Sequence, residues 1–203
     1  MKTFTFKNFN IADWFSFYRV IAAPILLALI WLDYRVFFAI ALLISYLTDA
    51  IDGFLARRLK ITSPRGSQLD SFGDQITMAV AIIGIYVFRK AFIQEHLMLI
   101  AVGFTPYIIQ MLIAYLKYEK ATAFHTYLAK TSAVIQCGFM VIAILFEPLN
   151  WLFYLMIIIG LLETLEEITL IFMYDTWVRD VKGVFWALKD KRRAPSQKTI
   201  TDS

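Results

Sequence analysis

The sequence predicts an all-α fold: a polytopic integral membrane protein with six transmembrane helices and both termini in the cytoplasm. Composition gives the first observation, because 60% of the 203 residues are hydrophobic, whereas soluble domains are about half apolar. Length gives the second, because a helix crosses the hydrocarbon core with about 20 mostly apolar residues. Six stretches approach that length: residues 15–32, 36–56, 70–88, 97–116, 127–146 and 151–173.

The first stretch is expected to be a true span rather than a removable signal peptide. Asn8, Asn10 and Asp13 stand around its start, and no small-residue cleavage site follows it. The fifth contains Cys137, the single cysteine, which we interpret as a small buried residue because it has no partner for a disulfide or a metal site. Tryptophans near the ends of the spans are interpreted as interfacial anchors.

The distribution of basic residues predicts the orientation. Short cytoplasmic loops accumulate Lys and Arg. The connectors after the first, third and fifth stretches hold only Arg35, Arg89 and Lys90 of the 20 basic residues. We therefore place both termini in the cytoplasm, with a membrane domain over residues 1–190 and a basic, disordered tail over residues 191–203. That tail suits anionic lipid better than nucleic acid, which we do not expect as a partner.

The sixth stretch carries three acids, Glu163, Glu166 and Glu167, spaced so that they could share one helix face. Acids are costly on a lipid-facing surface. Two interpretations remain open: the three line a polar cavity and pair with basic residues of the fourth or fifth helix, or the span ends near Leu165 and they meet the interface.

Four aspartates flank the connector between the second and third stretches, in the run LTDAIDGFLARRLKITSPRGSQLDSFGDQIT over residues 47–77. Asp49 and Asp52 are three residues apart, and Asp70 and Asp74 are four apart, so each pair shares a helix face. The connector, expected over residues 58–68, is rich in basic residues and turn formers, which predicts an antiparallel hairpin. The two acidic faces can then meet at the cytoplasmic boundary.

Carboxylates gathered at a membrane boundary repel one another unless a cation neutralises them. Oxygen ligands without nearby His or Cys favour Mg²⁺ or Mn²⁺ over Zn²⁺. Two such ions are a common arrangement for displacement at phosphorus. Gly53 and Ala56 remove bulk beside the carboxylates, and Arg57 offers donors to phosphate oxygens; in isolation, Gly53 and Ala56 would be interpreted as helix-packing residues.

The segment resembles the signature of the CDP-alcohol phosphatidyltransferase family. The eight matching positions, at matching spacings, are Asp49, Asp52, Gly53, Ala56, Arg57, Gly66, Asp70 and Asp74. A weaker likeness is the opening pattern Asn10, Ile11, Arg19 and Pro24, which begins before the first stretch and runs into it. The length of the chain and the Lys130-Thr131 pair resemble the phosphatidylglycerophosphate-forming branch, whereas the run from Asp70 to Gln75 departs from that branch's usual Asp-Pro and following Lys.

The resemblance implies an enzyme of phospholipid biosynthesis in the inner membrane, with its active site facing the cytoplasm. The enzyme would move a phosphatidyl group from CDP-diacylglycerol to an alcohol and release CMP. Asp49, Asp52 and Asp70 would ligate two metal ions, and Asp74 would contact the second ion and act as general base. Gly53, Arg57 and Ser63 match positions that contact the CDP-lipid, and Ala56 and Gly66 complete that segment. A homodimer is implied as well.

Cations gather just before and within the fifth stretch: Lys117, Lys120, His125 and Lys130. They predict an acceptor that carries its own phosphate, such as glycerol 3-phosphate or an inositol phosphate. Alternatively, they are flanking residues that extend to the lipid headgroups, and the acceptor is unphosphorylated, as inositol or serine is. Rivals from other classes are a cation transporter that uses the intramembrane carboxylates and a lipid-binding protein without catalysis.

Overall fold

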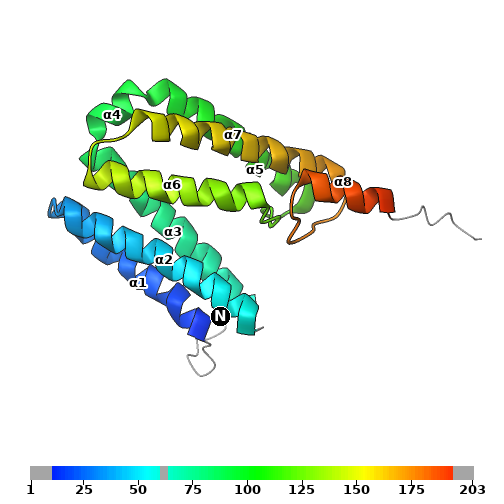
Figure 1. Ribbon diagram of the computed structural model, residues 1–203. Helices are drawn as coiled ribbons and strands as arrows, with labels where there is room; N and C mark the ends of the chain where they lie inside the picture. Colours follow the sequence, from blue (N-terminus) through cyan, green and yellow to red (C-terminus); the bar gives the residue numbers. More distant parts are fainter. Residues whose placement is uncertain (1–10, 60–63, 194–203) are drawn as a thin grey trace, which may run out of the picture. The chain divides into compact units, whose positions relative to one another are not determined.

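The computed structural model describes residues 11–59 and 64–193, and this part of the chain is all-α, with one isolated β-bridge between Ala123 and Arg179 (Figure 1). The all-α part of the predicted fold is therefore confirmed. For some residues within these helices, near the predicted site, the structure describes the backbone and not the side chain. The helices are α1 (Ile11–Trp31), α2 (Arg35–Leu59), α3 (Pro64–Phe88), α4 (Lys90–Glu95), α5 (Leu97–Tyr118), α6 (Tyr127–Leu145), α7 (Asn150–Met173) and α8 (Val184–Arg193).

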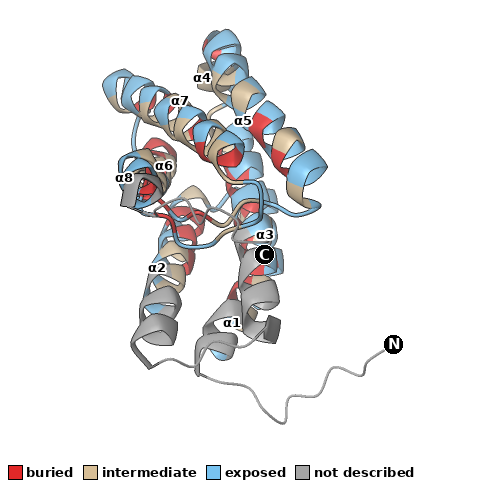
Figure 2. Cartoon of the chain, turned by 90° about the vertical axis from the view of Figure 1, so that its right-hand side faces the viewer, coloured by how far each residue is buried: buried red, intermediate tan, exposed pale blue. Residues whose placement is uncertain are grey.

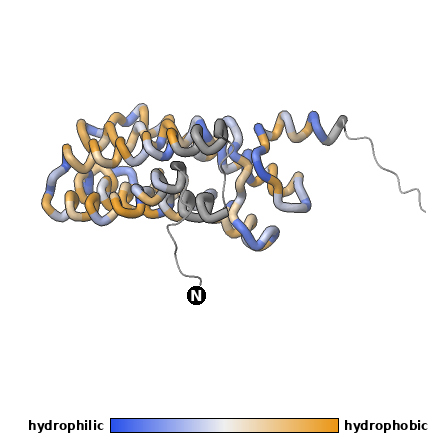
Figure 3. The backbone as a smooth tube through the Cα atoms, turned by 90° about the horizontal axis from the view of Figure 1, so that it is seen from below, coloured by the Kyte–Doolittle hydropathy of each residue, from blue (hydrophilic) through white to orange (hydrophobic). Residues whose placement is uncertain are grey.

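The chain forms two compact units. The first comprises residues 1–95 and 137–149, and the second comprises residues 96–136 and 150–203. Helix α6 therefore contributes its first half to the second unit and its second half to the first. Hydrophobic residues run along the helices of both units, and hydrophilic residues gather toward the helix ends and connectors (Figure 3).

In the first unit, α1 packs against both α2 and α3. Buried small and aliphatic side chains of α1 face the other two helices: Ala22, Ala23, Leu26 and Ile30. Helices α2 and α3 meet closely at Gly84, where an added Cβ would lie 2.4 Å from Cζ of Phe38. The same Phe38 ring contacts that of Phe88 in a tilted arrangement, with 5.5 Å between centroids. Glycine at position 84 therefore lets a large aromatic ring fill the space between these helices.

Arg89 joins the end of α3 to the end of α6 within the first unit. Its Nε donates to the carbonyl of Ala143 at 2.6 Å, and its Nη2 donates to the carbonyl of Phe146. Its Nη1 also pairs with Glu147 at 3.2 Å. The last carbonyls of a helix have no partners within the helix, so this guanidinium serves as the C-terminal cap of α6.

In the second unit, α5 packs against α7, and α7 against α8. Their core at one end is a cluster of six buried residues, Ala114, Phe124, Leu170, Ile171, Val181 and Ala187. The connector after α5 and the connector after α7 lie together here, because the Asp180 N–H donates to the Ala123 carbonyl at 3.1 Å and the Tyr127 N–H donates to the Lys182 carbonyl at 3.2 Å.

Two helices of the described residues, α5 and α6, are long and apolar enough to cross a membrane. Only 11% of the α5 window and 28% of the α6 window are buried, and neither helix is at the N-terminus. Most of α5 is accordingly drawn as exposed in Figure 2. Their exposed apolar side chains suit lipid. The six predicted spans are not all confirmed: α1 and α3 contain shorter apolar stretches, Phe17–Trp31 and Gln75–Phe88.

Several predicted boundaries were wrong. Helix α2 continues to Leu59, and α3 begins at Pro64, so the connector expected over residues 58–68 shortens to residues 60–63, which lie outside the described part. Proline suits the first position of a helix, because its missing N–H would have no partner there and its φ is already helical. Two unpredicted helices are present, α4 and α8. Helix α8 continues to Arg193, past residue 191, where we placed the start of the tail; residues 194–203 lie outside the description.

Candidate active site

The four aspartates lie on two helices of the first unit. Asp49 and Asp52 belong to the continuous helix α2, and Asp70 and Asp74 to the continuous helix α3, and these two helices pack together. All four aspartates therefore lie within helices, as their spacing predicted. Of the four side chains, that of Asp49 is described, and those of Asp52, Asp70 and Asp74 lie outside the description. Among the described side chains, no three acidic, His or Cys residues come together as a metal site.

The residues predicted to contact the CDP-lipid occupy the same two helices. Gly53, Ala56 and Arg57 lie on α2, one to two turns beyond Asp49, and Gly66 lies in the first turn of α3. The structure gives their positions along the helices and not the positions of their side chains. Ser63 lies outside the described residues.

Asp49 is held by a buried arginine. Its side chain is 44% exposed, and its Oδ1 accepts a hydrogen bond from Nη1 of Arg19 on α1, whose side chain is 1% exposed. In the helical turn before Asp49, the two hydroxyl side chains donate to backbone carbonyls of the same helix. Ser45 donates to the Ala41 carbonyl at 3.0 Å, and Thr48 donates to the Ser45 carbonyl at 2.8 Å. The Arg19 contact was missed from the sequence, although Arg19 had been noted there, because helix periodicity does not indicate which residue of another helix it meets.

The predicted acceptor-binding cations lie in the second unit. Nζ of Lys117 donates to the Ile171 carbonyl at 2.8 Å, near the end of α7, and lies 3.9 Å from Asp175. Lys117 therefore serves as a cap of α7, where a cation is favoured. His125 is exposed, in the connector between α5 and α6, with a left-handed φ of 53°.

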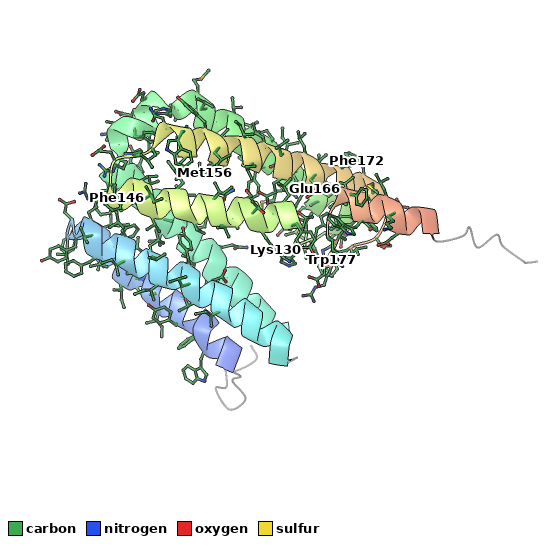
Figure 4. The ribbon with its side chains drawn as sticks, viewed as in Figure 1. Lys130, Phe146, Met156, Glu166, Phe172 and Trp177 are labelled. Carbon is green, nitrogen blue, oxygen red and sulfur yellow. The ribbon has the colours of Figure 1, made fainter. Side chains whose placement is uncertain are left out.

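The remaining two cations lie over aromatic rings. Lys120 is 5.5 Å from the Trp177 ring centroid, and Lys130, in the first turn of α6, is 5.7 Å from that of Tyr127. Figure 4 labels Lys130 and Trp177 in the second unit. Both lysines are exposed, so their ammonium groups remain accessible to an anion from solvent.

The three glutamates of α7 find mostly neutral partners. Oε2 of Glu167 accepts from the Gln110 amide and from the Thr122 hydroxyl, both at 2.7 Å. The predicted pairing with basic residues is not seen among the described residues, and α7 continues past Leu165 to Met173. Gln110 and Thr122 were not predicted as partners from the sequence, where the one available signal was the presence of polar side chains in and beside an apolar stretch.

Glu166 instead contacts α8. Its Oε1 accepts a hydrogen bond of 3.2 Å from the Val184 N–H, the first residue of that helix, and Figure 4 labels this side chain beside the start of α8. A carboxylate is favourable at a helix N-terminus. Gly183, with φ of 150°, leaves room for the contact, because a Cβ at this position would lie 2.9 Å from Oε1.

Comparison with known proteins decides the family. The family model for CDP-alcohol phosphatidyltransferase matches residues 9–174. The chain belongs to that family. The matched range takes in Arg19, the four aspartates and the cations of the second unit, whereas α8 lies beyond it. The predicted resemblance is thus confirmed over most of the chain.

Individual relatives match this chain over shorter ranges than the family model does. Proteins named CDP-diacylglycerol–glycerol-3-phosphate 3-phosphatidyltransferase are 32% identical over 77 residues in Sodalis glossinidius and 35% identical over 77 residues in Yersinia pestis. Each match covers 36% of this chain and 42% of the relative. A protein of that name in Pseudomonas fluorescens is 33% identical over 90 residues, 43% of each chain. The chain thus spans less than half the length of these curated relatives. No solved structure matches it.

Proposed function

We propose that this family member transfers the phosphatidyl group of CDP-diacylglycerol to glycerol 3-phosphate and releases CMP. The observation that carries the proposal is the placement of the family signature: its aspartates lie on α2 and α3, two helices that pack together, and Asp49 presents a half-exposed carboxylate held by a buried arginine. The names of the relatives support glycerol 3-phosphate as acceptor.

Asp49, Asp52, Asp70 and Asp74 would hold two Mg²⁺ or Mn²⁺ ions. The donor set fits such ions, because carboxylate oxygens are the ligands that hard divalent cations prefer. When bound, the ions would stabilise negative charge on the oxygens around the reacting phosphorus. The partial exposure of Asp49 is consistent with a ligand that a cation reaches from solvent.

The chemical step needs a base and a leaving group. Asp74 would accept the proton of the acceptor hydroxyl as that oxygen forms a bond to the phosphorus of the phosphatidyl group. The bond between this phosphorus and the bridging oxygen of CMP breaks, and CMP leaves with the electron pair. Gly53, Ala56 and Gly66 would leave room for the CDP group, and Arg57 and Ser63 would donate hydrogen bonds to it.

The acceptor phosphate would be bound by cations of the second unit, with Lys130 and His125 as the principal donors. Both are exposed, whereas Lys117 already donates to the end of α7, so its part would be the smaller. We further propose six membrane spans with both termini and the active site on the cytoplasmic side of the inner membrane, and a homodimer. The charge asymmetry of the connectors supports this orientation.

The test is CMP release by the purified protein with Mg²⁺ or Mn²⁺, CDP-diacylglycerol and a panel of acceptors: glycerol 3-phosphate, an inositol phosphate, inositol and serine. We expect release with glycerol 3-phosphate and little with the two unphosphorylated compounds. CMP release only with inositol or serine would support the phosphatidyl transfer but reject a phosphorylated acceptor. Absence of CMP release with every acceptor, together with metal uptake into proteoliposomes, would reject the enzyme in favour of a cation transporter.

A further inference from the structure

Among the described residues of the first unit, Arg19 is the largest fully buried side chain, and its partner is the first aspartate of the signature. It projects from α1, where the other described buried residues are apolar. Taking a guanidinium out of water is costly, and the cost is offset only when the charge is paired and its donors are used. Since Arg19 donates to Asp49 on α2, the position of one carboxylate is fixed by a residue within the helical core.

The geometry leaves Asp49 able to serve two partners. An ionised carboxylate has two oxygens and about four acceptor sites, and Arg19 uses Oδ1. The side chain as a whole is 44% exposed, so it is not enclosed by the arginine. A guanidinium has a planar, rigid set of donors, so it restricts the rotation of the carboxylate that it binds.

We propose that Arg19 is a positioning residue, which holds Asp49 in the orientation in which its second oxygen ligates a divalent cation. This inference rests on the proposed function, which makes Asp49 a metal ligand. Before a cation arrives, Arg19 also neutralises one of the four carboxylates of the segment, and it thereby reduces their mutual repulsion.

Two effects of Arg19 on metal affinity oppose each other. Its positive charge repels a divalent cation, whereas its hydrogen bond orients the ligand in advance. Loss of a partner that orients a metal ligand typically lowers metal affinity about 10- to 100-fold. The repulsion is the weaker effect here, because the Arg19 charge is already paired with Asp49 in a direct contact. Removal of Arg19 should therefore weaken metal binding.

The experiment measures Mn²⁺ affinity by electron paramagnetic resonance on the full-length protein in detergent, without lipid substrate. Arg19→Gln removes the charge and the planar set of donors, and we expect its Mn²⁺ Kd to rise about tenfold or more. Arg19→Lys keeps the charge with a single donor group and should give an intermediate Kd. Arg89→Gln is the matched control, because it also removes an interhelical guanidinium from the first unit, and its Mn²⁺ Kd should equal that of the wild type.

A double-mutant cycle separates positioning from general stability. In an Asp49→Asn background, Arg19→Gln should have little further effect on the Mn²⁺ Kd, because its partner carboxylate is already gone. An unchanged or lower Kd in folded Arg19→Gln overturns the inference, as does an equal effect in the Asp49→Asn background. If Arg19→Gln does not fold, Arg19→Lys decides by the same criteria. A wild-type protein that neither binds Mn²⁺ nor releases CMP would overturn the proposed function itself.

Discussion

The amide of Gln110 in α5 donates a hydrogen bond of 2.7 Å to the carboxylate of Glu167 in α7. Gln110 is buried, and the Thr122 hydroxyl donates to the same carboxylate oxygen at 2.7 Å. Amide and hydroxyl donors thus solvate an acid on a helix that is otherwise largely apolar. This contact joins the two helices of the second unit that pack most extensively against each other.

Gln110→Ala should lower the stability of the protein, because Glu167 would lose one of its donors inside the helix pair. Hydrogen bonds between membrane helices contribute about 0.6 to 1.7 kcal/mol, and bonds to a charged group contribute about 1.5 to 3 kcal/mol. We expect a loss of about 1 to 2 kcal/mol, measured as a lower melting temperature in detergent. Gln94→Ala, at an exposed position of α4, is the control. Equal melting temperatures for the two variants would show that the bond adds no stability.

Gly84→Ala should destabilise the first unit, because the new Cβ would lie 2.4 Å from the Phe38 ring. Overpacking of this kind costs about 1 to 3 kcal/mol. Phe38→Leu removes the ring, so the double variant should recover part of the stability that Gly84→Ala loses. Melting temperatures of the two single variants and the double variant measure this coupling. Strictly additive losses would contradict the close approach of Gly84 to the ring.

Most of the helical segments could be predicted, because long apolar stretches and the positions of charges indicate helices directly. The end of α2 and the start of α3 could not be predicted. Arg58 and Leu59 suit a helix as well as a turn, and Pro64 starts a helix as readily as it ends one. Helix α8 was missed for a related reason. Its stability depends on Ala187 packing in the core of the second unit and on Glu166 at its N-terminus, which are both tertiary contacts.

The four aspartates of the site could be predicted because their spacing within each helix is a local property. Their environment could not. Arg19 lies 30 positions before Asp49, and no periodicity of α1 indicates that it faces that carboxylate. The partners of Glu167 were missed likewise, since charge complementarity suggested bases, whereas the fold supplies an amide and a hydroxyl.

Asp70→Ala should abolish turnover while the protein still inserts and purifies normally, if the aspartates hold divalent metal as proposed. Chelation of the wild type should have the same effect. Mg²⁺ or Mn²⁺ should restore activity and Ca²⁺ should not, because its larger and more variable coordination shell positions reacting oxygens less well. CMP release measures both. Activity near the wild-type level in Asp70→Ala would rule out the two-metal mechanism.

Asp74→Asn tests the general base. We expect turnover to fall about 100-fold or more, the usual effect of losing a general base, with the affinity for CDP-diacylglycerol largely retained. Turnover is measured by CMP release at saturating donor, and affinity by direct binding of the donor. A parallel collapse of donor affinity would instead identify Asp74 chiefly as a metal ligand.

Lys130→Ala tests whether the acceptor carries a phosphate. Lys130 is exposed, and its ammonium lies over the Tyr127 ring rather than in an ion pair that any described residue supplies. A phosphate bound there would gain charge-assisted hydrogen bonds of roughly 1.5 to 3 kcal/mol each. The acceptor KM should therefore rise about tenfold or more, since about 1.4 kcal/mol corresponds to a factor of ten. The KM for the CDP-lipid should stay unchanged, because the donor is expected on α2 and α3.

Lys90→Ala, in α4 of the first unit, is the matched control and should alter neither constant. If Lys130 only extends to the headgroups, both constants will stay at their wild-type values and the cations will no longer favour a phosphorylated acceptor.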